Sequence, residues 1–86
     1  MNEDQVMLKG KSILVQELDL TARPEQISDE EPLFSPLIRL DSIGLLRVIL
    51  ALEAAFGVEI DDEDLMEADL ETVANLIELV KKKLVS

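Results

Sequence analysis

The chain has 86 residues, which is the length of one small domain, so residues 1–86 are expected to fold as a single unit. It contains no cysteine and no histidine, which excludes disulfides, thiolate metal sites, the commonest zinc ligand and any Ser-His-Asp triad. Nineteen acidic against eight basic residues give a formal net charge of -11, the wrong sign for binding nucleic acid or an anionic membrane. We expect a monomer that acts on partners with basic or apolar surfaces.

The first predicted element is a helix over residues 4–19, where apolar residues recur at helical spacing and Asp4 is placed to cap the start. The preceding residues are acidic where a signal peptide would be basic. No apolar run approaches the roughly 18 residues of a membrane-spanning helix. We therefore expect a cytoplasmic protein that does not insert into a membrane.

Residues 21–40 are predicted to form a long loop, because they contain all three prolines and their apolar residues follow neither the helical nor the strand period. Loops of this length in small domains are commonly functional or packed on themselves. We expect Leu33, Phe34 and Leu37 to fill the core from this loop.

The clearest helix is predicted to open at Asp41 and Ser42 and to end at Phe56, with Gly57 in a left-handed terminal conformation. A helical wheel gives one apolar face that is expected to enter the core. It consists of Leu45, Val48, Ile49, Leu52 and Phe56. A second arc beside Ser42 carries Ile43, Leu46, Leu50 and Ala54, with Arg47 among them. The helix is thus apolar on more than one side, and we expect the second arc to face a partner.

Two more helices are predicted after Gly57. Val58 and Ile60 turn inward before an acidic run, residues 61–64, that suits the first turn of a short helix carrying Leu65 and Met66. The last helix follows Asp69, with Lys81 to Lys83 at its negative end. Its apolar positions are Leu70, Val73, Ala74, Leu76, Ile77, Val80 and Leu84. The fold class is therefore all-α, a small four-helix bundle with three longer helices and one short helix.

The acidic run over residues 61–64 offers hard oxygen ligands, but it lacks the alternating spacing, the glycine and the final glutamate of a calcium loop. We interpret it as a solvated helix start and predict no metal site. No catalytic residue is assigned either, because an autonomous hydrolase would need a means of activating its nucleophile that the sequence does not contain.

Ser42 alone could be an ordinary first-turn serine. However, the run from Leu40 to Ile43, followed by Leu46, Ile49, Leu52 and Phe56 to Ile60, resembles the acyl carrier protein family, in which an Asp-Ser-Leu motif opens the second of four helices. In that family the serine hydroxyl is joined through a phosphodiester to 4′-phosphopantetheine, which comes from coenzyme A and whose thiol holds acyl groups as thioesters. The resemblance implies that Ser42 carries this arm, that Asp41 helps a phosphopantetheinyl transferase to engage the site, and that the chain itself catalyses nothing.

Four positions depart from the family pattern. Ile43 replaces the usual leucine, Arg39 stands where a glycine is common, and Gly44 with Arg47 occupy positions that are often acidic in fatty-acid carriers. The loop before Ser42 is also longer than in a minimal carrier. These differences favour a specialised free-standing carrier of acyl or aminoacyl groups in fatty-acid-like, polyketide or related biosynthesis over a housekeeping carrier, which is the second interpretation. The alternative is an unmodified helical adaptor with the same fold.

The predicted partners are the transferase and the ligase, synthase and transferase enzymes that load and use the carrier. We expect docking to be apolar at Leu46 and Leu50, salt-sensitive through Asp62 and Glu63, and selective through Arg47. The candidate residues to line an alkyl cargo are Leu45, Ile49, Leu52 and Ile77.

Overall fold

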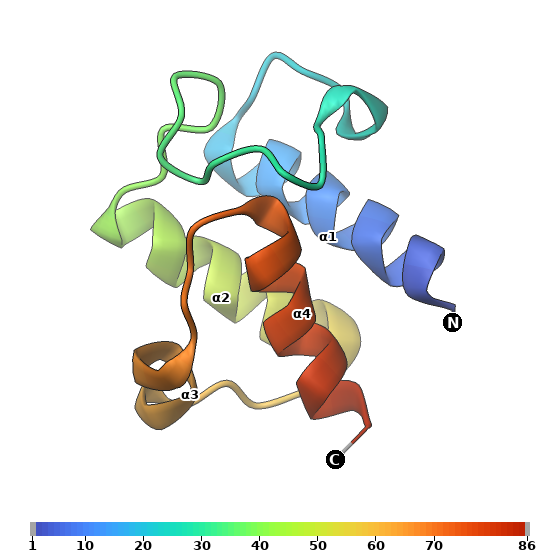
Figure 1. Cartoon of the computed structure of the whole chain (residues 1–86), viewed down its shortest axis with the longest axis vertical. Coiled ribbons are helices and arrows are strands. Elements are labelled where there is room, and N and C mark those ends of the chain that lie inside the picture. The colour runs from blue at the N-terminus through green and yellow to red at the C-terminus, as the bar shows by residue number, and fades with distance from the viewer. Residues whose placement is uncertain (1, 86) are drawn as a thin grey trace.

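A computed structural model describes residues 2–85 of the chain. Its elements, in chain order, are α1 (Glu3–Leu18), the 3₁₀ turn η1 (Pro24–Gln26), α2 (Ser42–Phe56), α3 (Asp62–Glu67) and α4 (Val73–Leu84). The predicted all-α bundle of three long helices and one short helix is confirmed (Figure 1). In this part of the chain, extended pairing is limited to an isolated bridge between Pro32 and Thr72. None of these helices is both long and apolar enough to cross a bilayer.

The start of α1 lies one residue before its predicted position, and the prediction that Asp4 caps it is wrong. Asn2 has an extended backbone, and its side-chain oxygen accepts the Gln5 N–H at 2.8 Å, while the Gln5 side chain accepts the Asn2 N–H at 2.9 Å. This reciprocal capping box satisfies two amides that the helix leaves without a partner. Asp4 already lies inside the first turn, where its charge complements the helix dipole.

The three long helices meet around one core. Gly10 of α1 faces Ile77 of α4 so closely that an added Cβ would lie 2.1 Å from the Ile77 Cδ1 atom, so only glycine permits this approach. Next to Gly10 on α1, Lys9 donates a hydrogen bond to the Ala55 carbonyl at 3.1 Å and lies 4.9 Å from the centre of the Phe56 ring. The lysine charge thus complements the negative end of α2.

The wheel prediction for α2 is confirmed on its core side. Val48, Ile49 and Leu52 are buried, while Leu45 and Phe56 are partly buried and packed against the same core. Gly57 ends the helix with φ of 66° and donates its N–H to the Glu53 carbonyl, as predicted. The remaining buried apolar residues are Val6, Ile13, Leu14, Ile27, Leu33, Ile38, Leu40, Ile60, Val73, Leu76, Ile77, Leu79 and Val80.

The loop before α2 fills the core with a different set of residues from the one predicted. Leu33 is fully buried as expected, but Phe34 is 68% and Leu37 is 37% exposed, so the prediction is wrong for these two. The backbone is held from both sides of Leu33, whose N–H donates to the Glu71 carbonyl at 2.8 Å and whose carbonyl accepts from Leu40 at 3.0 Å. This pairing fixes Leu33 inward and turns Phe34 to the surface, and Ile27, Ile38 and Leu40 take the expected places.

The same loop closes the start of α4. The α4 cap is Thr72, whose hydroxyl accepts the Asn75 N–H, so the helix begins three residues after the predicted position and Leu70 precedes it. The carbonyl of Glu31 accepts the Val73 N–H at 3.0 Å, and that of Asp29 accepts the Ala74 N–H at 2.8 Å. Loop carbonyls thus satisfy amides that a helix start cannot satisfy itself.

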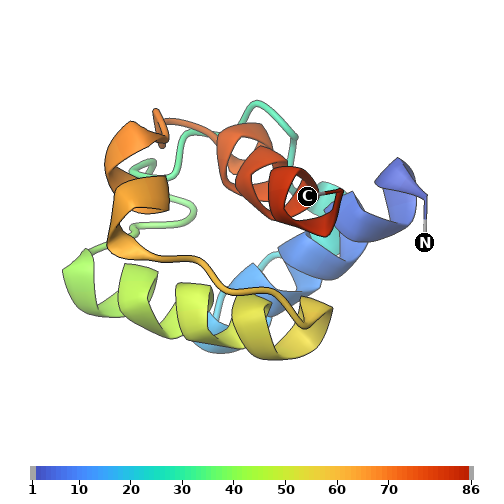
Figure 2. The same cartoon turned by 90° about the horizontal axis from the view of Figure 1, so that it is seen from below.

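The segment between α2 and α4 has few buried side chains. After Gly57 the chain turns back and carries α3 toward the N-terminal half of α2 (Figures 1 and 2). Ile60 is buried and Val58 packs against the core, as predicted, but no residue of α3 itself is buried. The short helix is therefore a surface element, whose Leu65 is partly buried against the core.

Candidate functional site

Ser42 is the first residue of α2, and the geometry around it is set by Asp41. The Asp41 backbone is extended, and its carboxylate Oδ1 accepts the Gly44 N–H at 2.6 Å, which makes Asp41 the helix cap. Ser42 therefore does not act as the helix cap, and it is exposed to solvent. The predicted opening of the helix at these two residues is confirmed.

Gly44 makes this cap possible. An added Cβ at Gly44 would lie 3.0 Å from the Asp41 Oδ1 atom and 2.9 Å from the Leu18 Cδ2 atom of α1. A side chain here would therefore press on the capping carboxylate and on the end of α1 at once. The absence of one lets the start of α2 lie close against the end of α1.

The N-terminus of α2 has the chemistry that a phosphodiester needs. The first amides of a helix lack intrahelical partners and, with the helix dipole, favour a negative group at this end. After the capping Asp41, the first turn of α2 contains no acidic side chain. An exposed primary hydroxyl at the first position of this 15-residue helix is thus suited to carry a phosphate ester.

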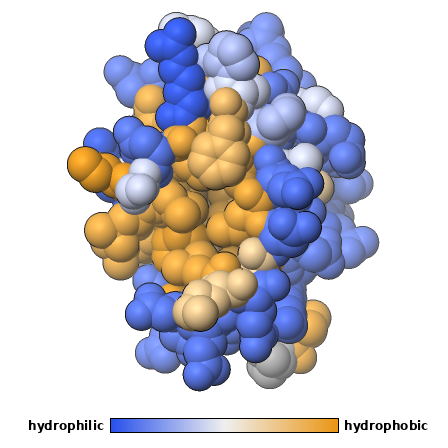
Figure 3. Space-filling model, turned by 60° about the vertical axis from the view of Figure 1, so that its left-hand side comes forward, coloured by the Kyte–Doolittle hydropathy of each residue, from blue (hydrophilic) through white to orange (hydrophobic). Residues whose placement is uncertain are grey.

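The arc of α2 beside Ser42 is exposed, as the wheel places it. Ile43 is 72%, Leu46 60% and Leu50 56% exposed, and Arg47 is also exposed. Figure 3 shows apolar side chains gathered on the side of the molecule formed by the loop, the start of α2 and α3. Phe34 from the loop and Met66 from α3, which is 84% exposed, add to the exposed apolar residues. We call Ile43, Leu46 and Leu50 the apolar stripe.

Sequence reasoning missed Phe34 as a surface residue. The only signal available was its neighbour Leu33, since adjacent residues in an extended segment point to opposite sides. That signal requires knowing which of the two is buried. For Met66, the pattern predicts a place on the short helix and leaves its exposure open.

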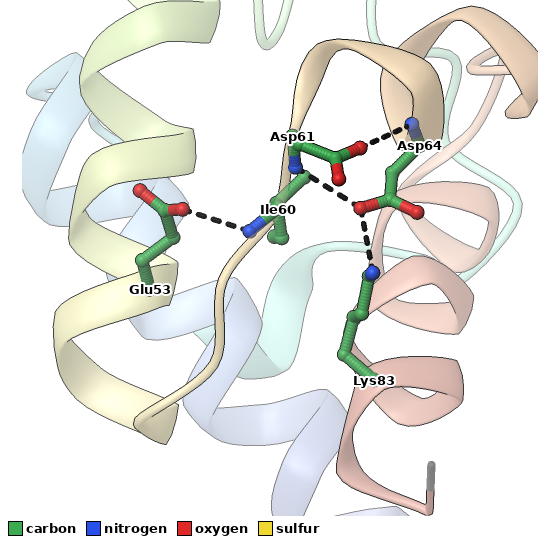
Figure 4. A network of polar contacts seen from close by, with 5 residues as sticks. All are labelled: Glu53, Ile60, Asp61, Asp64 and Lys83. Carbon is green, nitrogen blue, oxygen red and sulfur yellow. Dashed lines mark hydrogen bonds and ion pairs between the residues drawn. The ribbon is translucent and has the colours of Figure 1, made fainter.

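The acidic segment has several polar contacts (Figure 4), beside the partly buried Leu65, which packs against the core. Asp61 caps α3, and the side chains and amides of Asp61 and Asp64 exchange hydrogen bonds of 3.0 Å in both directions. Lys83 of α4 lies 2.7 Å from the Asp64 carboxylate. From α2, the Glu53 carboxylate accepts the Ile60 N–H at 2.8 Å. The Lys83 contact joins α3 to α4, and the Glu53 contact joins the residue before the α3 cap to α2.

The pairing of α3 with α4 shifts two pKa values. The hydrogen bond from Lys83, followed by the one from the Asp61 backbone, lowers the pKa of Asp64. The same hydrogen bond raises the pKa of Lys83. Both groups are therefore charged near neutral pH, and the contact is an ion pair.

The acidic side chains of this segment are spread out. Asp61 and Asp64 are committed to capping, while Asp62 and Glu63 point into solvent. Among residues 2–85, no three acidic side chains come together in the way that a metal ion requires. The predicted partner residues Asp62 and Glu63 thus lie on α3, across from the predicted partner residues of α2.

A groove lies between the end of α1, the loop and the start of α2. Its lining includes Leu37, Arg39, Asp41, Ile43 and Arg47. Arg39 has φ of 53°, a left-handed backbone conformation that residues other than glycine rarely adopt. Sequence comparison with the family pattern singled out Arg39 as a departure but gave it no role; the groove places it near Arg47.

Comparisons with known proteins agree with this geometry. The family described as phosphopantetheine attachment site matches residues 11–80. An acyl carrier protein of Thermosynechococcus vestitus is 32% identical over 83 residues, which cover 96% of each chain. One from Thermotoga maritima is 30% identical over the same length and coverage. The solution structure of a holo acyl carrier protein from Nitrosomonas europaea superposes with a TM-score of 0.81 at 29% identity, covering 95% of this chain and 99% of that one.

Proposed function

This chain belongs to the acyl carrier protein family, whose cofactor is a covalently attached 4′-phosphopantetheine, and on that premise we propose that Ser42 carries the arm. The observation that supports Ser42 is its exposed hydroxyl at the first position of α2, with the capping role taken by Asp41. The bound arm supplies a thiol, on which acyl groups are held as thioesters. Carriers of this family are not catalysts, and the chemistry belongs to partner enzymes.

Asp41 has two functions in this proposal. Its Oδ1 atom holds the start of α2 through the Gly44 N–H. Its Oδ2 atom makes no hydrogen bond within residues 2–85, and Asp41 is exposed, so this oxygen is free to contact a phosphopantetheinyl transferase. Ser42 then provides the oxygen that joins the new phosphodiester.

The experiment is the intact mass of the protein after co-expression with a broad-specificity phosphopantetheinyl transferase. Wild type is expected to gain the mass of one arm, and Ser42→Ala is expected to gain none while remaining folded. Ser12→Ala is the matched control, because Ser12 is an exposed helical serine on α1. A modified Ser42→Ala protein would refute the attachment residue. A wild-type protein that stays unmodified beside a modified control carrier would favour the alternative of an unmodified helical adaptor.

The apolar stripe is the proposed contact for partner enzymes, together with Asp62 and Glu63 on α3. Exposed leucines in a contiguous patch commonly mark a protein interaction site. Leu46→Ala is expected to slow modification while changing the free energy of unfolding by less than about 0.5 kcal/mol, because Leu46 is 60% exposed. A loss of about 2 kcal/mol or more, typical of a core truncation, would contradict the docking role.

We infer that the cargo is an acyl or aminoacyl group in fatty-acid-like, polyketide or related biosynthesis. Leu45, Ile49, Leu52 and Ile77 are the proposed lining for an alkyl chain, and all four belong to or pack against the core. An alkyl chain among them would have to separate the helices slightly, and each buried methylene would return about 0.8 kcal/mol. A medium-chain acyl group should therefore raise the melting temperature of the holo protein. No rise would favour a small polar cargo.

A further inference from the structure

We propose that Arg39 and Arg47 form a positively charged docking edge that binds carboxylate side chains of a partner enzyme, beside the apolar stripe and the attachment residue. We call these two residues the arginine edge. The proposal rests on the proposed function, since a docking edge at this place has a purpose only if Ser42 carries the arm. It adds the chemistry of the partner, which must present acidic groups on this side.

The two arginines are free to meet a partner. Both are exposed and both line the groove between α1, the loop and α2. Glu17 and Asp19 line the α1 side of the same groove, but within residues 2–85 neither arginine forms an ion pair with any carboxylate. An arginine without an internal partner is available for the bidentate pairing with carboxylates for which its planar head is suited.

The backbone of Arg39 adds an independent observation. Its φ of 53° lies in the left-handed region, where a side chain costs about 1 kcal/mol or more relative to glycine. The Arg39 N–H donates to the Ser35 carbonyl at 2.8 Å, so the turn requires this conformation. Unfavourable backbone geometry of this kind gathers at functional sites, because the side chain serves a purpose other than stability.

The two chain segments that form the proposed docking face have opposite net charges. Residues 33–52 contain two arginines and one acidic residue, a local charge of +1, whereas residues 53–71 contain nine acidic residues and no basic one, a local charge of -9. On the helical wheel of α2, Arg47 lies about 140° from Ser42, and the apolar stripe lies between them at about 40° to 100°. The stripe is therefore bordered by positive charge on the α1 side and by the acidic α3 segment on the other side.

This polarity selects both a partner and its orientation. A complementary surface has an apolar centre, carboxylates facing the arginine edge and basic groups facing Asp62 and Glu63. A surface that is basic throughout pairs well with α3 but is repelled at Arg39 and Arg47. Because only one orientation satisfies both sides, the edge also sets the direction from which the arm enters the partner.

The test uses a broad-specificity phosphopantetheinyl transferase with a basic docking patch as the probe. A second form of this transferase has one basic residue of the patch changed to glutamate. Rates of mass gain are measured for wild-type carrier, Arg47→Glu and Arg23→Glu with both forms. Arg23 is the matched control, since it is an exposed arginine outside the groove and either change takes the net charge from -11 to -13.

Arg47→Glu is expected to raise kcat/KM with the basic transferase roughly two- to fivefold at low ionic strength, and to lower it by a similar factor with the reversed form. Both effects should disappear near 1 M salt, where the Debye length is about 3 Å. Arg23→Glu should not give opposite responses. Equal responses from Arg23→Glu and Arg47→Glu would overturn the proposal in favour of net charge alone. A wild-type carrier that gains no mass would instead refute the proposed function.

Two further measurements test whether Arg39 has only a structural role and whether the arginines bind the arm's own phosphate instead of a partner. Arg39→Gly should change kcat/KM in the same direction as Arg47→Glu while raising the melting temperature, because glycine relieves the left-handed backbone. A lower melting temperature would mean that the Arg39 side chain is structural and would remove it from the edge. The ³¹P resonance of the holo protein should be the same in wild type, Arg39→Gly and Arg47→Glu. A shifted resonance would show that the arginines bind the arm's own phosphate and would overturn the proposal.

Discussion

The segments before and after α2 differ in how many of their side chains are buried, and their secondary structure does not show this difference. The loop over residues 21–40 has little regular structure, yet Ile27, Leu33, Ile38 and Leu40 are all buried. The segment over residues 58–72 contains a helix, yet no residue of that helix is buried and Ile60 is the buried residue before it. A regular backbone is thus a poor guide to how firmly a segment is held. Buried apolar area is the better guide.

This difference gives the proposed attachment site one firm side and one loose side. The loop is tied into the core and to α4 through backbone hydrogen bonds. The α3 segment has one buried side chain, Ile60, and partly buried ones such as Leu65, together with the Lys83–Asp64 ion pair and the bond between Glu53 and the Ile60 amide. Opening of the bundle to admit a cargo should therefore begin at α3, because local opening follows the segment with the fewest buried contacts.

The largest expected effect comes from Leu33. Leu33→Ala should lower the free energy of unfolding by about 2–5 kcal/mol, because this side chain is fully buried and its removal leaves a cavity in a small core. The measurement is equilibrium unfolding in urea followed by circular dichroism. Phe34→Ala, one residue away, is the control and should change stability by less than about 0.5 kcal/mol because Phe34 is 68% exposed. Equal losses for the two variants would contradict the firm loop.

A smaller effect is expected at Asp61. Asp61→Ala removes the α3 cap, which costs a helix about 1 kcal/mol, and amide exchange within residues 64–67 should accelerate about fivefold. Since α3 buries no side chain, the global free energy of unfolding should change less than this local value. Asp62→Ala has the same charge change without the capping bond and should leave exchange nearly unchanged. A fall in global stability equal to that of Leu33→Ala would show that α3 is as firmly held as the loop.

The smallest effect concerns pH. Because hydrogen bonds lower the pKa of Asp64 in the folded protein below its ordinary 3.8, this group stabilises α3 above that value and the contribution is lost as the pH falls through the lowered pKa. The ¹³C carboxyl resonance of Asp64 should therefore titrate with a midpoint below 3.8 in wild type. In Lys83→Met the midpoint should rise toward 3.8. An unchanged midpoint would mean that Lys83 does not act on Asp64.

The sequence was sufficient to predict the helices whose side chains follow a period, although not the cap of α1 or the first residue of α4. The extent of α2, its core face and its exposed stripe follow from helical spacing, and the site at Asp41 and Ser42 follows from the family pattern. The loop has no period, so the inward positions of Leu33 and Ile38 depend on hydrogen bonds to Ser35, Leu40 and the distant Glu71. The positive φ of Arg39 and the groove beside it arise from the same tertiary path and are absent from any local pattern.

Asp29 has a consequence for how the protein folds. Its carboxylate forms an ion pair with Lys11 of α1, which is only 8% exposed, while its carbonyl accepts the Ala74 N–H of α4. One residue of the loop therefore joins two helices that are about sixty residues apart in the chain. The first turn of α4 is thus closed by a loop residue that is itself joined to α1, so we expect α1, the loop and α4 to form one cooperative folding unit. The α3 segment lies outside that unit, and the chain can lose and regain it many times without crossing the barrier to global unfolding.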